Sequence, residues 1–235
     1  MGSPDQPPEH PTDALAALAE LARDALAAAS APRVLIGITG SPGAGKSTLA
    51  QALVAELNRA DGAAEAGPIA VHLPMDGFHL ANATLDRLGL RDRKGAIETF
   101  DGWGFAALLD RVVAETDHAV YAPGFERSVD EPVAAEIAID PAAAIVVVEG
   151  NYLLVDAPPW SRVGDLLDEA WFVQASEDER VRRLVERHAA FGRTPEAALA
   201  WALEVDGANA RIIEPTVARA DLVVSGATWR VEVGA

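Results

Sequence analysis

Residues 40–48 read Gly-Ser-Pro-Gly-Ala-Gly-Lys-Ser-Thr, and this stretch decides the fold. It is a complete G-x-x-x-x-G-K-S/T pattern, and the apolar run Val34–Ile38 leads directly into it. Its glycines allow the backbone to curl so that N–H groups point inward at phosphate oxygens, and a helix that starts near Lys46 adds its positive end. The stretch therefore predicts a strand, a phosphate-binding loop and a helix that together bind a nucleoside triphosphate.

The residues of this loop have separate expected roles. Lys46 is expected to reach the β- and γ-phosphates of ATP, and the hydroxyl of Ser47 to ligate Mg²⁺. The phosphates are expected to rest on the other loop residues, namely Gly40, Ser41, Pro42, Gly43, Ala44, Gly45 and Thr48. Lys46 and Lys94 are the two lysines among 19 basic residues, and a compact ammonium approaches phosphates in a way that arginine does not reproduce. A glycine-rich turn without a ligand would explain the glycines but not the lysine and the hydroxyl in register.

The composition limits the classes of protein to which the chain can belong. With 235 residues and 50% hydrophobic content, it fits a single α/β domain, which we expect over residues 12–235 after a disordered tail over residues 1–11. The 36 acidic and 19 basic residues give a formal net charge of −17, which disfavours nucleic acid and anionic membranes as partners. The chain has no cysteine, which excludes disulfides, thiolate zinc sites and cysteine nucleophiles. No segment approaches the roughly 20 apolar residues of a membrane span, so we expect a cytoplasmic protein.

Strands and helices alternate along the chain. Helical spacing of apolar residues predicts helices over Asp13–Ala29, Thr48–Arg59, Leu80–Leu90, Gly104–Glu115, Glu177–Ala190 and Pro195–Asn209. Short apolar runs predict strands over Val34–Ile38, Ile69–Leu73, Ile145–Val148, Ala170–Gln174 and Leu222–Val224, with a return over Thr228–Val233. Ala119–Tyr121 and Glu136–Ile139 are expected to pair as a flap. The alternation predicts an α/β fold with a mostly parallel, doubly wound sheet.

Two carboxylates follow predicted strands, where such sheets bind their ligands. Glu149 follows the β-branched run that is typical of a central strand, and it suits a metal role, either directly or through water. Asp76 follows the second strand and suits the base that accepts the proton of an attacking hydroxyl. Spacing alone leaves other interpretations open, because Asp-Gly is a common turn dipeptide and an acid can simply end a strand.

Arginines gather on the charged helix predicted from Glu177. Arg180, Arg183 and Arg187 stand at i, i+3 and i+7 and share one face, and Arg193 follows the break at Gly192. One interpretation is a lid that brings arginines onto a transferring phosphoryl group. The other is a solvated helix whose arginines pair with neighbouring acids, and for any single arginine it is the favoured one.

Several strings resemble the phosphoribulokinase/uridine kinase family, and within it the bacterial branch of fructose transport system kinases and pantothenate-kinase-like proteins. Besides the loop, they are PMDGFHL at 74–80, RKGAIETFDGWGF at 93–105, VYAPGFER at 120–127, VVVEGNYLL at 146–154 and ERVRRLVERHAAFGRT at 179–194. The similarity runs from about Arg33 to Val224. It implies a P-loop NTPase three-layer sandwich with a C-terminal β-hairpin, a helical lid over about 177–194, and acceptor-side loops over about 76–104 and 118–140.

The resemblance also implies roles for individual residues. Asp76 matches the family aspartate that contacts the acceptor hydroxyl, and Glu149 matches the acid near Mg²⁺. The lid arginines divide into the catalytic pair Arg183 and Arg187 and the nucleotide-binding pair Arg180 and Arg193. The resemblance places four residues in loops over the acceptor, namely Lys94, Asp101, Tyr121 and Arg127, with Trp103 as a wall.

Each of these acceptor-side residues has a plain alternative. Tyr121 can be a strand residue, Arg127 a surface ion-pair partner and Trp103 a packing residue at the start of a helix. Arg127 and Asp101 rank first, and an arginine there could pair with an anionic acceptor. One departure concerns Glu126, which stands where this branch usually has aspartate. If that acid touches the acceptor, the extra methylene could alter which acceptor fits.

The leading hypothesis is an ATP-dependent kinase that phosphorylates a hydroxyl of a small metabolite. A GTPase-type switch would need a guanine-recognition motif such as Asn-Lys-x-Asp, and neither lysine follows an asparagine. A non-catalytic nucleotide-binding regulator is the third hypothesis, and the intact Lys46, Ser47, Asp76 and Glu149 argue against the decay of the site that it would imply. A dinucleotide oxidoreductase is excluded because Thr48 occupies the position of the third glycine. A sugar, a nucleoside, a pantothenate-like alcohol and a phosphorylated sugar all remain open as acceptors, and so does assembly as a homodimer.

Overall fold

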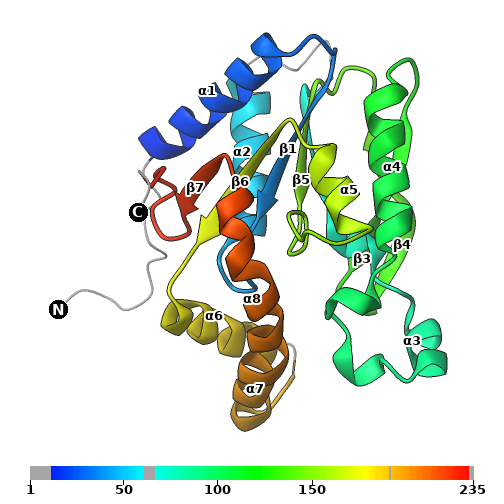
Figure 1. The fold of residues 1–235 in the computed structure, drawn as a ribbon, viewed down its shortest axis with the longest axis vertical. Helices are drawn as coiled ribbons and strands as arrows, with labels where there is room; N and C mark the ends of the chain where they lie inside the picture. Colours follow the sequence, from blue (N-terminus) through cyan, green and yellow to red (C-terminus); the bar gives the residue numbers. More distant parts are fainter. Residues whose placement is uncertain (1–11, 61–66, 191, 233–235) are drawn as a thin grey trace.

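The computed structural model describes residues 12–60, 67–190 and 192–232, so the tail predicted over residues 1–11 lies outside the described residues (Figure 1). The centre of the fold is a sheet of five strands in the order β2-β5-β1-β6-β7. The strands are β1 (Val34–Thr39), β2 (Ala70–Pro74), β5 (Ile145–Glu149), β6 (Glu169–Gln174) and β7 (Leu222–Ser225). All four neighbouring pairs are parallel, which confirms the predicted α/β class.

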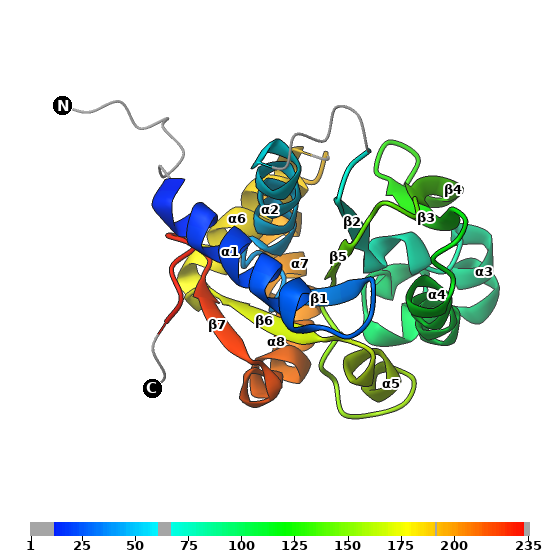
Figure 2. The same ribbon diagram turned by 90° about the horizontal axis from the view of Figure 1, so that it is seen from above.

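Helices cover both faces of this sheet and make three layers. One face packs against α1 (Thr12–Ala28) and α2 (Lys46–Ala60), and the other against α4 (Gly102–Ala114), α5 (Trp160–Asp165) and α8 (Gly207–Ile213). Figure 2 shows α1 and α2 on one side of the strands and α5 and α8 on the other. Alternate residues of β1 divide between the two cores, with Leu35 in one and Ile36 in the other. Each central strand must be apolar along its whole length, because successive side chains point to opposite faces of the sheet and both faces are buried.

The remaining helices lie near the carboxyl ends of the strands. They are α3 (Asn82–Leu88), α6 (Glu177–Ala190) and α7 (Pro195–Trp201). Helix α3 is shorter than predicted because Gly89 ends it in the left-handed conformation, with φ of 68°. Helix α6 has the predicted bounds. The helix predicted from Pro195 continues from α7 through a π-helical turn, Ala202–Asp206, into α8, so it is longer and less regular than expected.

Two hairpins flank the sheet. The predicted flap is an antiparallel pair, β3 (Val120–Glu126) and β4 (Glu131–Ile139), and it extends through the proline-bearing stretch with an irregularity between Ala122 and Gly124. The C-terminal hairpin is a short return, in which a single bridge joins Val224 to Val231. Val233, the predicted end of that return, lies outside the described residues. Across the ranges given above, no helix combines the length and the apolar composition needed to cross a bilayer.

Candidate active site

The phosphate loop connects β1 to α2, as the sequence predicts. Gly40, Gly43 and Gly45 have positive φ angles of 141°, 80° and 104°, a region that glycine occupies far more readily than other residues. A Cβ atom at Gly43 would lie 2.7 Å from the carbonyl oxygen of Arg180, and one at Gly40 would overlap the carbonyl oxygen of Val173. The loop therefore needs glycine both for its curl and for close packing against β6 and α6.

Lys46 and Ser47 begin α2 and face the end of β5. Ser47 Oγ donates a hydrogen bond of 3.2 Å to Glu149 Oε2, and Lys46 Nζ donates one of 3.2 Å to the carbonyl oxygen of Ser41. Burial lowers the pKa of Lys46, against the opposing charges of Glu149 and Asp76. Burial by itself would raise the pKa of Glu149, but the nearby His72 ring, the Lys46 charge and the Ser47 hydroxyl outweigh it and hold that pKa below its usual value. The Glu149 carboxylate is therefore ionised at neutral pH.

The oxygens of Ser47 and Glu149 form a donor set that fits Mg²⁺. This cation prefers oxygen ligands and is usually held by one or two carboxylates together with substrate phosphates and water. No group of three or more His, Cys, Asp or Glu side chains in the described ranges could hold a metal by protein ligands alone. A metal that shares the phosphates of a bound nucleotide suits this arrangement better than a permanent protein-only site.

His72 is a neighbour of Glu149 that the sequence analysis did not select. Its Nε2 lies 3.8 Å from Glu149 Oε2, too far for a hydrogen bond, and this buried nitrogen has no hydrogen-bond partner in the described part of the chain. Its position within β2 beside β5 explains the contact, since His72 is in register with Val147. The sequence places His72 on a strand but does not reveal which strand lies next to it.

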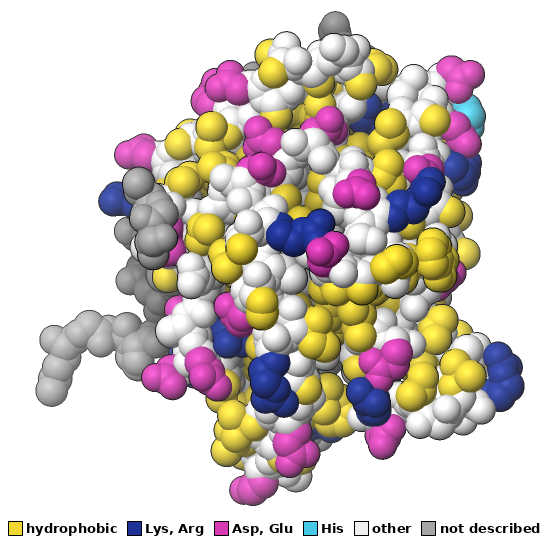
Figure 3. Space-filling model, viewed as in Figure 1, with side chains coloured by type: hydrophobic (Ala, Val, Ile, Leu, Met, Phe, Trp, Pro, Cys, Tyr) yellow, Lys and Arg dark blue, Asp and Glu magenta, His cyan; other side chains and the backbone are white. Residues whose placement is uncertain are grey.

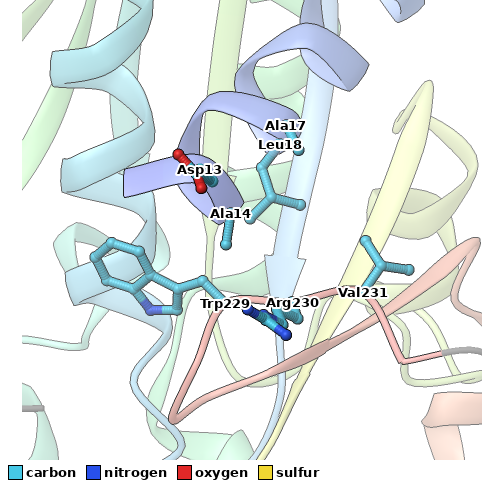
Figure 4. Close-up of a pocket in the computed structure, with 7 residues that line it drawn as sticks. All are labelled: Asp13, Ala14, Ala17, Leu18, Trp229, Arg230 and Val231. Atoms are coloured by element: carbon cyan, nitrogen blue, oxygen red, sulfur yellow. The ribbon is translucent and has the colours of Figure 1, made fainter. Parts of the chain in front are cut away.

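One cavity of about 980 Å³ opens beyond the carboxyl ends of the strands. Its lining includes the predicted residues Lys46, Ser47, Asp76, Lys94, Arg127, Glu149, Arg183, Arg187 and Arg193. They come from the phosphate loop, the ends of β2 and β5, the segment before α4, the β3–β4 hairpin, and α6 with the loop after it, so the fold brings together residues far apart in sequence. A second hollow, of about 290 Å³, lies between α1 and the C-terminal return and is mainly apolar (Figure 4). It contains none of the phosphate-loop residues and is not the candidate site.

Asp76 lies in the 3₁₀ turn Met75–Phe78 that follows β2. Its Oδ2 is 3.9 Å from Arg127 Nη2, and the two side chains are 38% and 51% exposed. That distance allows charge attraction but no hydrogen bond. The carboxylate of Asp76 therefore faces the cavity with lone pairs available to a ligand.

The arginines of α6 and of the loop after it differ in the protein groups that they contact. Arg183 Nη1 donates to the carbonyl oxygens of Gly43 at 3.2 Å and Ala44 at 3.1 Å, so this side chain is bound to the phosphate loop itself. The guanidinium of Arg193 lies 3.9 Å from the centre of the Trp201 ring. Arg187 lines the cavity and makes no hydrogen bond or ion pair with any described residue.

The prediction that Arg180 binds the nucleotide is corrected, because Arg180 does not line the cavity. It is buried behind the phosphate loop, where its Nη2 lies 3.7 Å from Glu214 Oε1. Glu214 also accepts a hydrogen bond from the hydroxyl of Ser41. The first turn of α6 packs directly on the back of the loop, so the arginine nearest that end supports the loop from outside the cavity.

Three acceptor-side predictions also need correction, because these side chains are absent from the cavity lining. Asp101 caps α4, and its Oδ1 accepts a hydrogen bond of 2.8 Å from the backbone N–H of Gly104. Tyr121 is 58% exposed, because its neighbours Val120 and Ala122 turn to the buried side of the strand. Trp103 is 64% exposed on α4.

Glu126 and Lys94 both make hydrogen bonds to residues of the β3–β4 hairpin. Glu126 Oε1 accepts a hydrogen bond of 2.8 Å from the backbone of Ser128, and the Glu126 side chain lies outside the cavity. Lys94 lines the cavity, but its ammonium donates to Asn82 Oδ1 at 2.7 Å and to the carbonyl oxygen of Asp130, and lies 3.0 Å from Asp130 Oδ2. Lys94 thus joins the acceptor-side loop to the tip of the β3–β4 hairpin.

His79, Phe100 and Phe125 are cavity residues that the sequence analysis missed. The His79 ring lies between the two phenylalanine rings, with centroid distances of 4.0 Å to Phe100 and 4.7 Å to Phe125. These residues belong to three of the quoted strings, but nothing in the strings shows that the rings meet.

Comparisons with known proteins place the chain in a family. A sequence model of the "Phosphoribulokinase / Uridine kinase family" matches residues 35–230. A Schizosaccharomyces pombe protein named "Putative uridine kinase" is 35% identical over 198 residues, which cover 82% of this chain and 83% of the relative. An uncharacterised Escherichia coli protein is 34% identical over 192 residues, which cover 82% and 77%.

Among solved structures, a "putative fructose transport system kinase" from Silicibacter sp. TM1040 has a TM-score of 0.76 and 38% identity. The match covers 86% of this chain and 94% of that chain. The family match spans the phosphate loop, both strand-end carboxylates and the arginine-bearing helix α6. The chain therefore belongs to the phosphoribulokinase/uridine kinase family and is a kinase of that family.

Proposed function

We propose that this kinase transfers the γ-phosphoryl group of ATP to a hydroxyl of a small molecule. The observation that carries the proposal is that the phosphate loop, Asp76, Glu149 and Arg187 all line one cavity. A phosphoryl donor and an acceptor both need space next to these groups, and a cavity of about 980 Å³ is large enough for two such ligands.

The proposed reaction forms a bond between the acceptor oxygen and the γ-phosphorus and breaks the bond from that phosphorus to the β–γ bridging oxygen. The hydroxyl proton passes to the Asp76 carboxylate, and ADP leaves. Lys46 offsets negative charge on the β- and γ-phosphates, and Arg187 approaches the equatorial oxygens, where charge spreads in the transition state. Mg²⁺ that arrives with the nucleotide would be held by Ser47 and Glu149 and would supply further positive charge at the phosphates.

Several further assignments belong to the same proposal. Residues 12–235 act as one domain, in which residues 177–194 close as a lid over the phosphates. Loops over about 76–104 and 118–140 enclose the acceptor. Arg127, which is half-exposed beside Asp76, is the charged side chain best placed to meet an anionic part of the acceptor.

A screen for the acceptor tests the proposed function. Release of ADP is followed with Mg²⁺ and ATP, or GTP, in the presence of sugars, nucleosides, pantothenate and related alcohols, with Lys46→Ala as the blank. We expect ATP-dependent formation of a phosphorylated product that mass spectrometry identifies. Binding of ATP without any product would favour a regulator, and a preference for GTP would favour a switch. The relatives' names point to different substrates, so the panel includes both uridine and fructose.

Asp76→Asn tests the proposed base. We expect kcat to fall about 10²- to 10⁴-fold, because the amide cannot accept the hydroxyl proton, while the affinity for Mg·ATP changes little. Asp110→Asn is the matched control, since Asp110 is a surface residue of α4 that pairs with Arg162. Stopped assays of product formation give kcat, and calorimetry gives the affinity. Near-normal turnover by the Asp76 variant would remove it from the mechanism.

A further inference from the structure

Asp206 is a buried carboxylate that the proposed phosphoryl transfer does not use. It ends the π-helical turn Ala202–Asp206 between α7 and α8, and it is 7% exposed. By helical spacing it shares the buried face of this segment with Ala202, Ala210 and Ile213, which are all apolar. Burying a carboxylate among apolar groups is costly unless the carboxylate has a partner. Asp206 therefore needs a hydrogen-bond donor close by.

The partner of Asp206 is His188 on α6. Its Nε2 lies 2.8 Å from Asp206 Oδ2, and the two side chains are 16% and 10% exposed. An ionised carboxylate can only accept a hydrogen bond, so Nε2 carries a proton and donates it. The two residues are 18 positions apart in the chain, and Figure 1 shows α6 beside α7. The bond therefore ties the C-terminal end of α6 to the helical segment that follows α7.

Folding alone does not require an ionisable pair at this position. Replacing a buried ion pair with well-packed apolar side chains is often neutral or stabilising. Apolar packing is also available here, since the centroid of the His188 ring lies 6.4 Å from that of Trp201. What a hydrogen bond adds is a fixed distance and direction between the two segments that it joins. Because both His188 and Asp206 line the cavity, a role of this bond in the site explains the pair better than folding does.

Arg187 is the cavity residue that precedes His188 in the chain. Its side chain is exposed, lines the cavity and makes no hydrogen bond or ion pair with any residue in the described ranges. With no polar partner there to hold the guanidinium, its place in the cavity depends on the position of the α6 backbone. Any contact that fixes the last turns of α6 therefore also fixes the point from which Arg187 extends.

Protein contacts fix α6 on both sides of Arg187. Four residues before it, Arg183 donates to two carbonyl oxygens of the phosphate loop. One residue after it, His188 donates to Asp206. Helix α6 then ends at Ala190. Without the bond from His188, the stretch of α6 that bears Arg187 would be held by polar contacts on its N-terminal side alone.

We propose that His188 and Asp206 are positioning residues, whose hydrogen bond holds Arg187 within reach of the transferring phosphoryl group. The inference rests on the proposed function and adds a support to the side chain that this function assigns to the transition state. Neither residue has to touch the phosphates: Asp206 orients His188, and His188 fixes the backbone of α6. A misplacement of about 1 Å in a site can lower the rate by about 10²-fold, so a support of this kind has a measurable effect.

Two substitutions of His188 separate the hydrogen bond from the ring. In His188→Gln, the side-chain amide nitrogen reaches the position of Nε2 and can donate to Asp206. In His188→Asn, the shorter side chain does not reach it. Both variants lose the ring beside Trp201, so they are controls for each other.

Two further variants complete the set. Asp206→Leu removes the hydrogen bond without leaving a buried charge unpaired, so it replaces His188→Asn if that variant fails to fold. His118→Asn is the control for a histidine–aspartate pair outside the cavity. His118 Nδ1 lies 2.7 Å from Asp117 Oδ1, and these two side chains are 57% and 88% exposed.

With an acceptor from the screen, we expect His188→Asn and Asp206→Leu to lower kcat about 10²-fold, with little change in the affinity for Mg·ATP. His188→Gln should recover most of kcat, and His118→Asn should match the natural protein. In the Arg187→Met background, adding His188→Asn should cause no further loss, because the two residues act as one unit. A further loss in that double variant, or equal losses in the Asn and Gln variants of His188, would overturn the proposal.

Binding of a transition-state mimic gives a second readout, which needs no acceptor. Aluminium fluoride beside Mg·ADP stands in for the transferring phosphoryl group, and calorimetry measures how much it tightens the binding of Mg·ADP. We expect Arg187→Met and His188→Asn each to reduce this tightening about tenfold, the loss typical of one hydrogen bond. His118→Asn should not reduce it.

The two readouts separate failure of the inference from failure of the proposed function. If the natural protein phosphorylates no acceptor, the proposed function fails, while the fluoride measurement still decides the role of the His188–Asp206 pair. Unchanged tightening in His188→Asn, or no tightening in the natural protein, would overturn the inference.

Discussion

The cationic side chains of the cavity differ in how many of their N–H groups the protein already uses. Lys94 is bound to Asn82 and Asp130, and Arg183 to the carbonyl oxygens of Gly43 and Ala44. Arg187 has no such partner among the residues described. A side chain that already donates to protein atoms must break those hydrogen bonds before it can bind a phosphate. Arg187 can bind a phosphate without breaking any. Arg187 is therefore the side chain from which we expect the largest contribution to the transition state.

Arg187→Met should lower kcat by about 10²- to 10³-fold, the loss found on removing one preorganised donor to a transition-state charge. The affinity for Mg·ATP should change much less. Arg182→Met is the control, because Arg182 is exposed on the same helix and pairs with Glu186 at 2.8 Å. Steady-state kinetics and calorimetry give the two quantities. Similar losses of kcat in both variants would indicate a general effect on α6 instead.

The pKa of His79 predicts a pH dependence of stability. Burial lowers this pKa below the ordinary value of 6.5, while Asp76 and Asp130 oppose the shift and Lys94 adds to it. The unfolded chain therefore takes up the proton at a higher pH than the folded chain. The stabilisation is fully present above pH 6.5 and is lost as the pH falls through the lower, folded-state pKa. Urea denaturation at a series of pH values should show a steeper acid-side loss for the natural protein than for His79→Asn, and parallel curves would contradict this assignment.

At the level of elements, the position of Asp76 depends on the β3–β4 hairpin. The turn Met75–Phe78 packs against β3, and Gly77 is buried there. A Cβ atom on Gly77 would overlap the carbonyl oxygen of Pro123. Backbone atoms cannot move aside as the end of a side chain can, so any larger residue at position 77 must displace the hairpin or the turn. Both of these carry acceptor-side residues of the cavity.

Gly77→Ala should destabilise the protein by about 1–3 kcal/mol, the usual cost of overpacking. It should also lower kcat/KM for the acceptor while leaving Mg·ATP affinity nearly unchanged, because the phosphate loop is on a different element. Gly207→Ala is the control, since its Cβ would meet its nearest neighbour at an ordinary 3.7 Å. Thermal denaturation and steady-state kinetics measure both effects. An intact acceptor site in Gly77→Ala would refute the dependence on the hairpin.

At the scale of the whole molecule, the parallel sheet lies between two hydrophobic cores. Arg33 joins segments of the chain that surround one of these cores. Its buried guanidinium donates to the carbonyl oxygens of Ala143 at 2.7 Å, Val112 at 2.7 Å and Asp140 at 2.9 Å. These carbonyls lie at the end of α4 and between β4 and β5. Charges on the surface are dispersed by comparison, and on the face in Figure 3 basic side chains lie among acidic and hydrophobic ones.

Arg33→Met should reduce the free energy of unfolding by about 3 kcal/mol, because it leaves buried carbonyl groups without donors. Nucleotide affinity should stay the same, since Arg33 precedes β1 and the phosphate loop follows it. Arg59→Met is the control, because the side chain of Arg59 is 70% exposed and solvent screens its ion pair, so its loss should change stability far less. Urea denaturation measures both variants. A loss as small as that of the control would show that these bonds contribute little.

The part of the site that could be predicted from the sequence is the part encoded by contiguous residues. Residues 34–48 contain the strand, the curled loop and the start of the helix in one contiguous stretch, so their conformation follows from local preferences. The β-branched strand before Glu149 and the apolar strand before Asp76 predict where both carboxylates emerge, because parallel strands all end at one edge of the sheet. These positions needed no knowledge of how the layers pack.

The sequence by itself determined that this chain has a nucleotide-binding loop on a parallel sheet with two carboxylates at the strand ends. Only the tertiary structure decided which side chains enter the cavity. Arg180 and Arg187 share a helical face, but α6 is so placed that Arg180 supports the loop and Arg187 meets the cavity. Tyr121 faces outward, and His79 lies between rings from two other segments. The rotation of a helix and the side of a strand that faces inward are set by contacts between distant residues, which spacing along the chain does not specify.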